Sequence, residues 1–164
     1  MNGATLKIVR EALCLSAPWF AELCEVDEST LLAWESGNMQ VPEVAAIQIG
    51  LLESMAADMA AQVVDWIGEN IAESGLPECP VRLVVYADAE AMARFQPEMP
   101  KLPVSFHAGI VARVRWAMQP LGVEIEAHTL NVASYDAWLQ ATQQEDSQAL
   151  RAQYVMLDDC EYPN

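Results

Sequence analysis

The sequence predicts a mainly α-helical chain with a small α/β part, and three observations lead to this prediction. Apolar residues recur at helical spacing through most of the first 74 residues. A segment with Gly and Pro at 75–80 then interrupts the pattern. Two apolar segments, 81–87 and 123–130, are typical of strands and enclose helical patterns. Helices between two strands favour parallel pairing through a right-handed crossover.

Two domains follow from this pattern. Residues 1–75 are expected to form a helical domain that includes a long amphipathic helix. Residues 76–164 are expected to form a small α/β domain with a two-stranded, parallel sheet. The chain has 164 residues, of which 53% are hydrophobic, so it is long enough to bury a core.

Three short helices are predicted in the first 42 residues. Leu6 and Leu13 mark the buried face of the first helix. Ser16 is placed to cap the second helix, and Asp27 is placed to cap the third, which should run over about 28–36.

A fourth helix should begin at Pro42, with Val44, Ile47, Leu51 and Leu52 facing the core. The helical period of 54–74 is able to continue directly from it.

The C-terminal part predicts further helices around the two strands. Asp88 is placed to cap a short helix that ends near Phe95, and a last helix should begin at Ser134. His107 lies in phase with the apolar stripe of another helix, so a satisfied core histidine is favoured over a ligand or a catalytic base. Arg113 and Arg115 lie off that stripe and are most simply solvated, although a small basic patch with Arg82 is an alternative.

The segment 6–42 carries the most specific pattern of the chain, with the spacing of a compact helix-turn-helix unit. Its members are Leu6, Arg10, Leu13, Ser16, Phe20, Ala21, Leu23, Val26, Leu31, Trp34, Glu35, Gly37 and Pro42. This pattern resembles the Cro/C1-type helix-turn-helix family, which implies an N-terminal Cro/C1-like helix-turn-helix bundle. Together with the segments 103–107 and 135–139, it also resembles a bacterial family that joins such a unit to a small α/β domain.

The resemblance implies a repressor-like, DNA-binding transcriptional regulator that acts as a homodimer on double-stranded DNA. It also implies a structural ion pair between Arg10 and Glu35. The candidates for DNA contact are the positions at the start of helix 2, along helix 3 and just after it. They are Ser16, Ala17, Glu28, Ser29, Thr30, Ala33, Asn38 and Gln40.

The charge of the chain opposes this expectation. The formal net charge is -16, and residues 1–53 contain 2 basic and 8 acidic residues, which gives -6. No lysine or arginine lies between Glu11 and Val81, so helix 3 lacks the arginine contact to guanine that is commonest in specific binding. Glu25 also stands in a turn where the family usually has glycine. The alternative is a helix-turn-helix scaffold used as an acidic protein-protein interaction module, with little or no DNA binding.

Other classes of function find no support in the sequence. A glycine-rich phosphate loop, an HExxH motif and a nucleophile elbow are absent, so neither an enzyme nor a cofactor is expected. The four cysteines do not have the spacing of metal ligands, and we expect them to be reduced thiols of a cytoplasmic protein. They are Cys14, Cys24, Cys79 and Cys160. We expect no targeting segment, no membrane span and no metal site.

Overall fold

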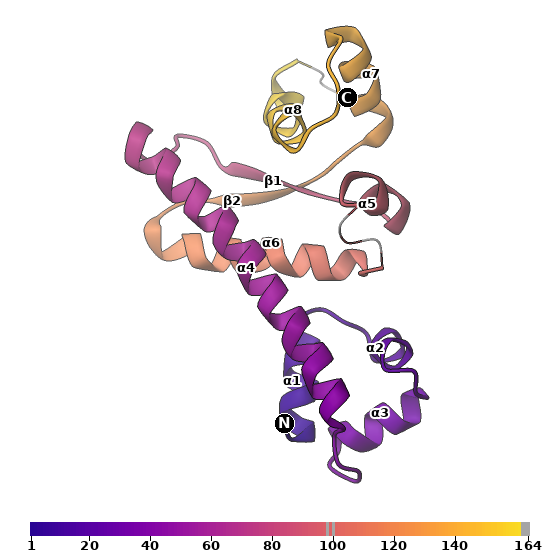
Figure 1. Cartoon of the computed structure of the whole chain (residues 1–164). Helices are drawn as coiled ribbons and strands as arrows, with labels where there is room; N and C mark the ends of the chain where they lie inside the picture. The colour runs from indigo at the N-terminus through magenta and orange to yellow at the C-terminus, as the bar shows by residue number, and fades with distance from the viewer. Residues whose placement is uncertain (98, 100, 162–164) are drawn as a thin grey trace. The chain divides into compact units, whose positions relative to one another are not determined.

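The computed structural model describes residues 1–97, 99 and 101–161. Over these residues the chain forms eight α-helices and a small parallel sheet of two strands, which confirms the predicted fold class (Figure 1). The chain divides into two compact units, Met1–Gln62 and Val63–Asn164. This division falls inside a long helix, and the domain boundary expected after residue 75 stays a prediction.

Three short helices and the first part of a long one build the N-terminal unit. The short helices are α1 (Gly3–Ala12), α2 (Ala17–Leu23) and α3 (Glu28–Glu35), and both α1 and α2 pack on α3. The predicted cap of α2 is present, because Ser16 Oγ accepts a hydrogen bond from the backbone N–H of Trp19 at 3.3 Å. The largest buried apolar side chains of this unit are Leu6, Leu13, Leu15, Phe20, Leu31, Trp34 and Ile49.

The long helix α4 (Glu43–Ser74) is continuous over 32 residues, as the helical period allows. Its orientation differs from the sequence-based expectation, because Ala45 and Ile49 are buried. Val44, Ile47 and Leu51 are 66%, 54% and 65% exposed, so the prediction that they face the core is wrong. Apolar residues occupy two faces of this helix roughly 145° apart, and periodicity alone does not distinguish them.

Helix α4 is also long and apolar enough to cross a membrane, and it is the one such helix among the residues described. No membrane-spanning segment was expected from the sequence. This property rests on the length and composition of α4 alone, and the core helix of a soluble protein meets the same criterion. Acidic residues are spread along α4 from Glu43 to Glu73, and Ile67 is buried within the protein.

Strands β1 (Val81–Val85) and β2 (Ile125–Thr129) form the sheet of the second unit. They pair in parallel, with Val81 opposite Ile125 and Val85 opposite Thr129, so the predicted pairing is confirmed. Ile125 is buried, whereas Ala127 and Thr129 further along β2 are exposed. Packing against helices thus buries little of β2 beyond Ile125.

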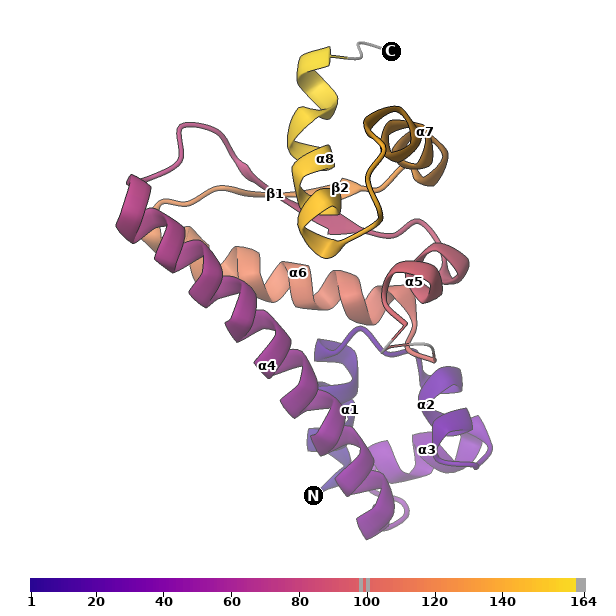
Figure 2. The ribbon, with the colours of Figure 1, turned by 45° about the horizontal axis from the view of Figure 1, so that its top comes forward.

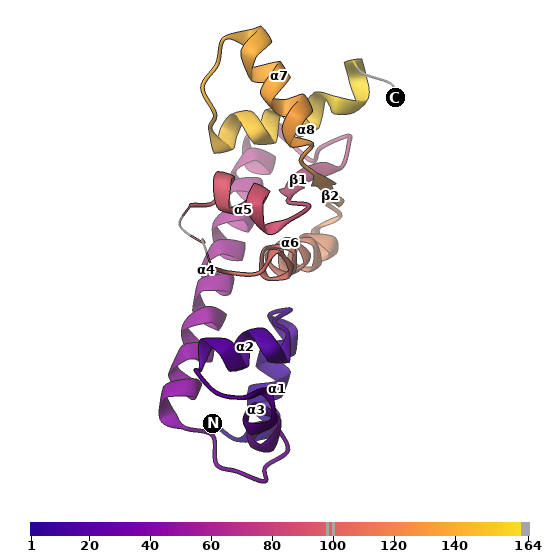
Figure 3. The same ribbon diagram turned by 90° about the vertical axis from the view of Figure 1, so that its right-hand side faces the viewer.

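Helices cover both faces of this sheet. Helix α6 (Val104–Met118) contacts both strands on one face, and α8 (Gln148–Glu161) packs on β1 from the other (Figures 2 and 3). The crossover between the strands consists of α5 (Ala89–Phe95), α6 and a short 3-10 helix, η1 (Gln119–Leu121). The cap predicted for α5 is present, because Asp88 accepts from the backbone N–H of Ala91 at 2.8 Å.

Two helices follow β2, where the sequence predicted one. Helix α7 (Val132–Thr142) begins after Asn131, which caps it, and therefore two residues before the expected start at Ser134. It ends at Gln143, whose backbone has a positive φ of 56°. The segment between Gln143 and α8 is polar and gives no apolar helical period, so the sequence did not predict α8.

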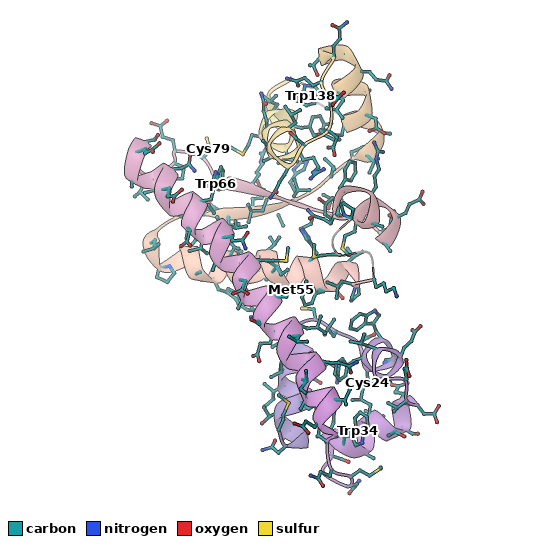
Figure 4. The ribbon with its side chains drawn as sticks, viewed as in Figure 1. Cys24, Trp34, Met55, Trp66, Cys79 and Trp138 are labelled. Carbon is teal, nitrogen blue, oxygen red and sulfur yellow. The ribbon has the colours of Figure 1, made fainter. Side chains whose placement is uncertain are left out.

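Aromatic side chains fill the core between α5, α7 and α8. Tyr135 is fully buried, and its ring lies 5.9 Å from Phe95 and 5.3 Å from Tyr154, centroid to centroid. Trp138, labelled in Figure 4, stacks beside Tyr135 at 6.0 Å. The Tyr135 hydroxyl donates to Asp146 at 2.8 Å. Burial is the larger cause of a raised pKa of Tyr135, and this hydrogen bond is the second cause.

Candidate functional site

Helix α3 is fixed against α1 by a buried ion pair. Arg10 Nε donates to Glu35 Oε1 at 2.6 Å, and Arg10 Nη2 donates to Glu35 Oε2 at 3.1 Å. Arg10 Nη1 also donates to the carbonyl oxygen of Leu15 at 2.7 Å. The hydrogen bond to Glu35 raises the pKa of Arg10, with burial opposing it. The structure thus brings together the two residues of the expected ion pair, and neither charge is available to a ligand.

The backbones of α1 and α3 also approach each other closely at Gly3. Gly3 is buried at the start of α1, and a Cβ atom built there would lie 1.8 Å from the carbonyl oxygen of Trp34. No side chain larger than hydrogen fits at this point without a shift of α1 or α3. Sequence reasoning missed this position, because a glycine near a chain start carries no periodic signal.

The residues expected to contact DNA lie along α2 and α3 but are unevenly exposed. Glu28 and Ser29 are exposed on α3, whereas Thr30 and Ala33 are half-buried. Leu32, which the expectation omitted, is 48% exposed on the same helix. At the start of α2, Ser16 is exposed but its hydroxyl caps the helix, and Ala17 is half-buried. Asn38 and Gln40 are exposed in the segment after α3.

Carboxylates dominate the surface around the turn that joins α2 to α3. We define the acidic surface as Glu22, Glu25, Asp27 and Glu28, all of which are exposed. The first three line a shallow depression together with Val26 and Thr30. Within the described part of the chain, none of the four carboxylates lies within 4.0 Å of a basic side chain. Sequence reasoning named Glu28 as a DNA contact, but it did not assemble these four residues into one surface.

Asp27 occupies the N-cap position of α3 without capping it by its side chain. The backbone there is extended, as expected for a cap, but the carboxylate makes no hydrogen bond to the helix. The expected side-chain cap is therefore absent, and the Asp27 charge stays on the acidic surface. Glu25 adopts a left-handed backbone with φ of 57°, which is costly for a residue other than glycine.

Cations do not compensate these charges within the N-terminal unit. Residues 1–62 contain two basic residues, Lys7 and Arg10, against nine acidic ones, so the formal charge is 2 minus 9, or -7. Arg10 is buried with Glu35, and Lys7 lies 4.0 Å from Glu11 on α1. The α2–α3 turn therefore carries a strong negative potential.

Among its described residues, the second unit offers no comparable group of candidate residues. His107 is buried as expected, but its Nδ1 atom has no hydrogen-bond partner, so the expected satisfied histidine is not found. Burial lowers its pKa. Arg82, considered for a basic patch, donates to Glu126 at 3.1 Å and to the carbonyl oxygen of Val155 at 3.1 Å. No group of three or more His, Cys, Asp or Glu residues among those described is placed to hold a metal ion.

Comparison with known families gives a different family from the one that the sequence pattern resembles. Residues 1–158 match the family described as Domain of unknown function (DUF4447). The chain belongs to the DUF4447 family. No helix-turn-helix family matches this DUF4447 chain, so its expected membership of the Cro/C1-type family, and of the bacterial family that joins such a unit to an α/β domain, is wrong. No curated protein is significantly similar to it.

The mistaken assignment has a physical explanation. The residues that produced the resemblance, such as Leu6, Leu31 and Trp34, are buried in the packing of three short helices. Arg10 and Glu35 lock the same helices together. Any compact bundle with this geometry needs apolar residues at such spacings, so the pattern describes how the DUF4447 chain packs and does not identify its family.

Proposed function

We propose that this chain is a protein-interaction module whose acidic surface docks a basic partner protein. The observation that carries the proposal is the group of four exposed carboxylates around the α2–α3 turn, Glu22, Glu25, Asp27 and Glu28, none of which forms an ion pair within 4.0 Å among the described residues. A surface of one charge sign raises the local concentration of an oppositely charged partner and its rate of association.

Rigidity of the underlying helices supports the same proposal. The Arg10–Glu35 pair and the close contact at Gly3 hold α1 against α3. The carboxylates therefore sit on a framework that does not need to be ordered on binding. A preformed surface loses less conformational entropy in a complex than a flexible segment does.

DNA binding by α3 is the second candidate function. Exposed Ser29, Asn38 and Gln40 favour it, because hydroxyl and amide groups contact phosphates and bases. The acidic surface opposes it, because Glu28 and Asp27 at the start of α3 would repel the phosphate backbone. With one exposed basic residue in 1–62, counterion release contributes little to affinity. This candidate predicts a specific complex at 50 mM salt in fluorescence anisotropy with duplexes from upstream of its own gene, and the absence of one would exclude it.

Affinity capture with matched charge variants tests the main proposal. The surface variant combines Glu22→Gln, Glu25→Gln, Asp27→Asn and Glu28→Gln. The control variant removes four exposed carboxylates elsewhere, through Asp65→Asn, Glu69→Gln, Glu73→Gln and Glu78→Gln. Both variants change the net charge by +4, so a difference between them reports position and not total charge.

We expect the wild type and the control variant to retain the same basic protein from a cell lysate at 0.15 M salt, and the surface variant to lose it. Titration of the purified partner against the three proteins should reproduce this order. Equal retention by all three proteins, or no retained protein at all, would rule out the acidic surface as the docking site.

A further inference from the structure

Strand β2 has one open side. Along its other side it pairs with β1 through the backbone groups of Glu126 and His128, as the parallel register requires (Figure 1). The N–H and C=O groups of the alternate residues Ile125, Ala127 and Thr129 therefore point away from β1. The sheet has two strands, and within the described part of the chain no hydrogen bond reaches these outward groups. They form a row of unused donors and acceptors.

This open edge is exposed and lacks the features that usually block a strand edge. Ala127 and Thr129 are exposed, and their side chains are small. Folded proteins commonly protect an edge with lysine, proline or a β-bulge. Strand β2 contains neither lysine nor proline, and its pairing with β1 runs without a bulge. By contrast, β1 is half-buried along its length, and α8 packs on it. A further strand is therefore best received by β2.

The side chains along β2 determine which segment suits this edge. Successive side chains of a strand point to opposite faces, so Glu126 shares one face with Glu124, and Ala127 shares the other with Thr129. Glu126 is 54% exposed at its side chain and pairs at 3.1 Å with Arg82, which is 16% exposed and lies on the far side, on β1. An added strand therefore meets the carboxylate first. Opposite charges across two strands stabilise their pairing.

Glu124 supplies a second carboxylate just before β2. It is exposed, and among the described residues no ion pair within 4.0 Å reaches it. Arg115 of α6 lines a shallow depression together with Glu124 without pairing with it. Lysine or arginine opposite these two glutamates, and β-branched side chains over the small residues on the other face, would complement the edge.

We propose that the open edge of β2 binds an extended segment of a partner protein as a third strand, and that this segment alternates basic with β-branched residues. In such strand addition, backbone hydrogen bonds supply affinity and alternate side chains supply specificity. A second copy of this chain suits the edge less well. Residues 63–164 contain 6 basic and 15 acidic residues, which gives -9, so two such units repel each other.

Amide hydrogen exchange of the full chain, followed by NMR, tests the pairing. The probe is a capped nonapeptide that alternates lysine with valine. We expect a dissociation constant on the order of 0.1 mM, because each hydrogen bond adds little net affinity and the peptide must be ordered. With the peptide at about ten times this constant, exchange of the outward amides of Ala127 and Thr129 should slow about tenfold. The amides of Glu126 and His128 already pair with β1 and should change little.

A proline variant separates strand pairing from charge attraction. Ala127→Pro removes an outward N–H and takes no hydrogen bond from the pairing with β1, which is the position where an edge strand tolerates proline. It should weaken peptide binding at least about tenfold. Ala127→Ser keeps the N–H and should bind the peptide like the wild type. Circular dichroism establishes that both variants are folded.

Modified peptides test the same point on the wild-type protein. One peptide is N-methylated at its lysines and the other at its valines. Since alternate N–H groups of an added strand face β2, one of the two methylated peptides should lose binding and the other should keep it. Equal effects of the two methylations, unchanged exchange at Ala127 and Thr129, or equal slowing by a peptide that alternates glutamate with valine would overturn the proposal.

Self-association has its own outcome. Slower exchange of the Ala127 and Thr129 amides as the protein concentration rises, without any peptide, would identify a second copy as the occupant and overturn the proposal. The variant with four neutralised carboxylates on the acidic surface should give the same exchange result as the wild type. Failure of strand addition therefore leaves the acidic surface untouched, and failure of the acidic surface leaves the β2 edge untouched.

Discussion

At the scale of single residues, Gly3 is where the packing of the N-terminal unit is least tolerant. Gly3→Ala would place a methyl group 1.8 Å from the Trp34 carbonyl oxygen. Because the obstacle is backbone, the helices must separate, and we expect a loss of about 2–4 kcal/mol in the free energy of unfolding. Urea denaturation measures it. Gly68→Ala, in α4 where a Cβ meets nothing within 4 Å, serves as the control and should be neutral or stabilising.

Glu25 holds a left-handed backbone that glycine adopts without strain. Glu25→Gly should therefore raise the free energy of unfolding by roughly 0.5–1 kcal/mol, which thermal denaturation would report as a higher melting temperature. Glu25→Ala removes the same charge and keeps the strained backbone. If both variants stabilise the protein equally, relief of charge repulsion and not of strain is the cause.

His107 makes the stability of the second unit depend on pH. Its pKa in the folded state is lowered by burial, and the Tyr86 ring packs against it at 5.1 Å. The unfolded chain therefore binds its proton first, near pH 6.5. Stability is complete above this pH and falls as the pH drops toward the folded-state pKa, by up to about 1.4 kcal/mol per pH unit. Denaturation between pH 5 and 7 should show a flatter profile for His107→Phe than for the wild type.

At the scale of elements, the Arg10–Glu35 pair determines how α1 meets α3. Arg10→Met leaves the Glu35 carboxylate buried without its partner, and we expect a cost of about 3 kcal/mol. The double variant Arg10→Met and Glu35→Leu removes both charges and should recover most of that loss. Urea denaturation of the two single variants and the double variant gives the coupling energy, and a coupling near zero would show that the pair does not hold the helices.

The elements also show what sequence patterns are able to predict. Caps at Ser16 and Asp88 and the parallel pairing of β1 with β2 followed from local chemistry and chain topology. The inward face of α4 did not, because its apolar residues form two stripes on different faces of the helix and only packing against the neighbouring helices determines which one is buried. Helix α8 was missed, since its start is polar and its partner, β1, is distant in the sequence.

At the scale of the whole molecule, net charge was readable from the sequence but its arrangement was not. The value of -16 indicated a poor DNA-binding protein. The grouping of Glu22 and Glu25 with Asp27 and Glu28 required the turn between α2 and α3, and the burial of Arg10 removed one of the two nearby cations. Tertiary packing therefore converts a diffuse acidic composition into a defined surface, and the candidate site was only partly predictable.

Zero-length cross-linking tests this account most directly. A carbodiimide joins carboxylates to the lysines of a partner only where the two are in contact, and mass spectrometry identifies the residues joined. With lysate proteins captured by the full chain, the account predicts cross-links that concentrate at Glu22, Glu25, Asp27 and Glu28 and disappear in 0.5 M salt. Cross-links spread evenly over the acidic residues, or concentrated at Asp65, Glu69 and Glu73 of α4, would contradict it.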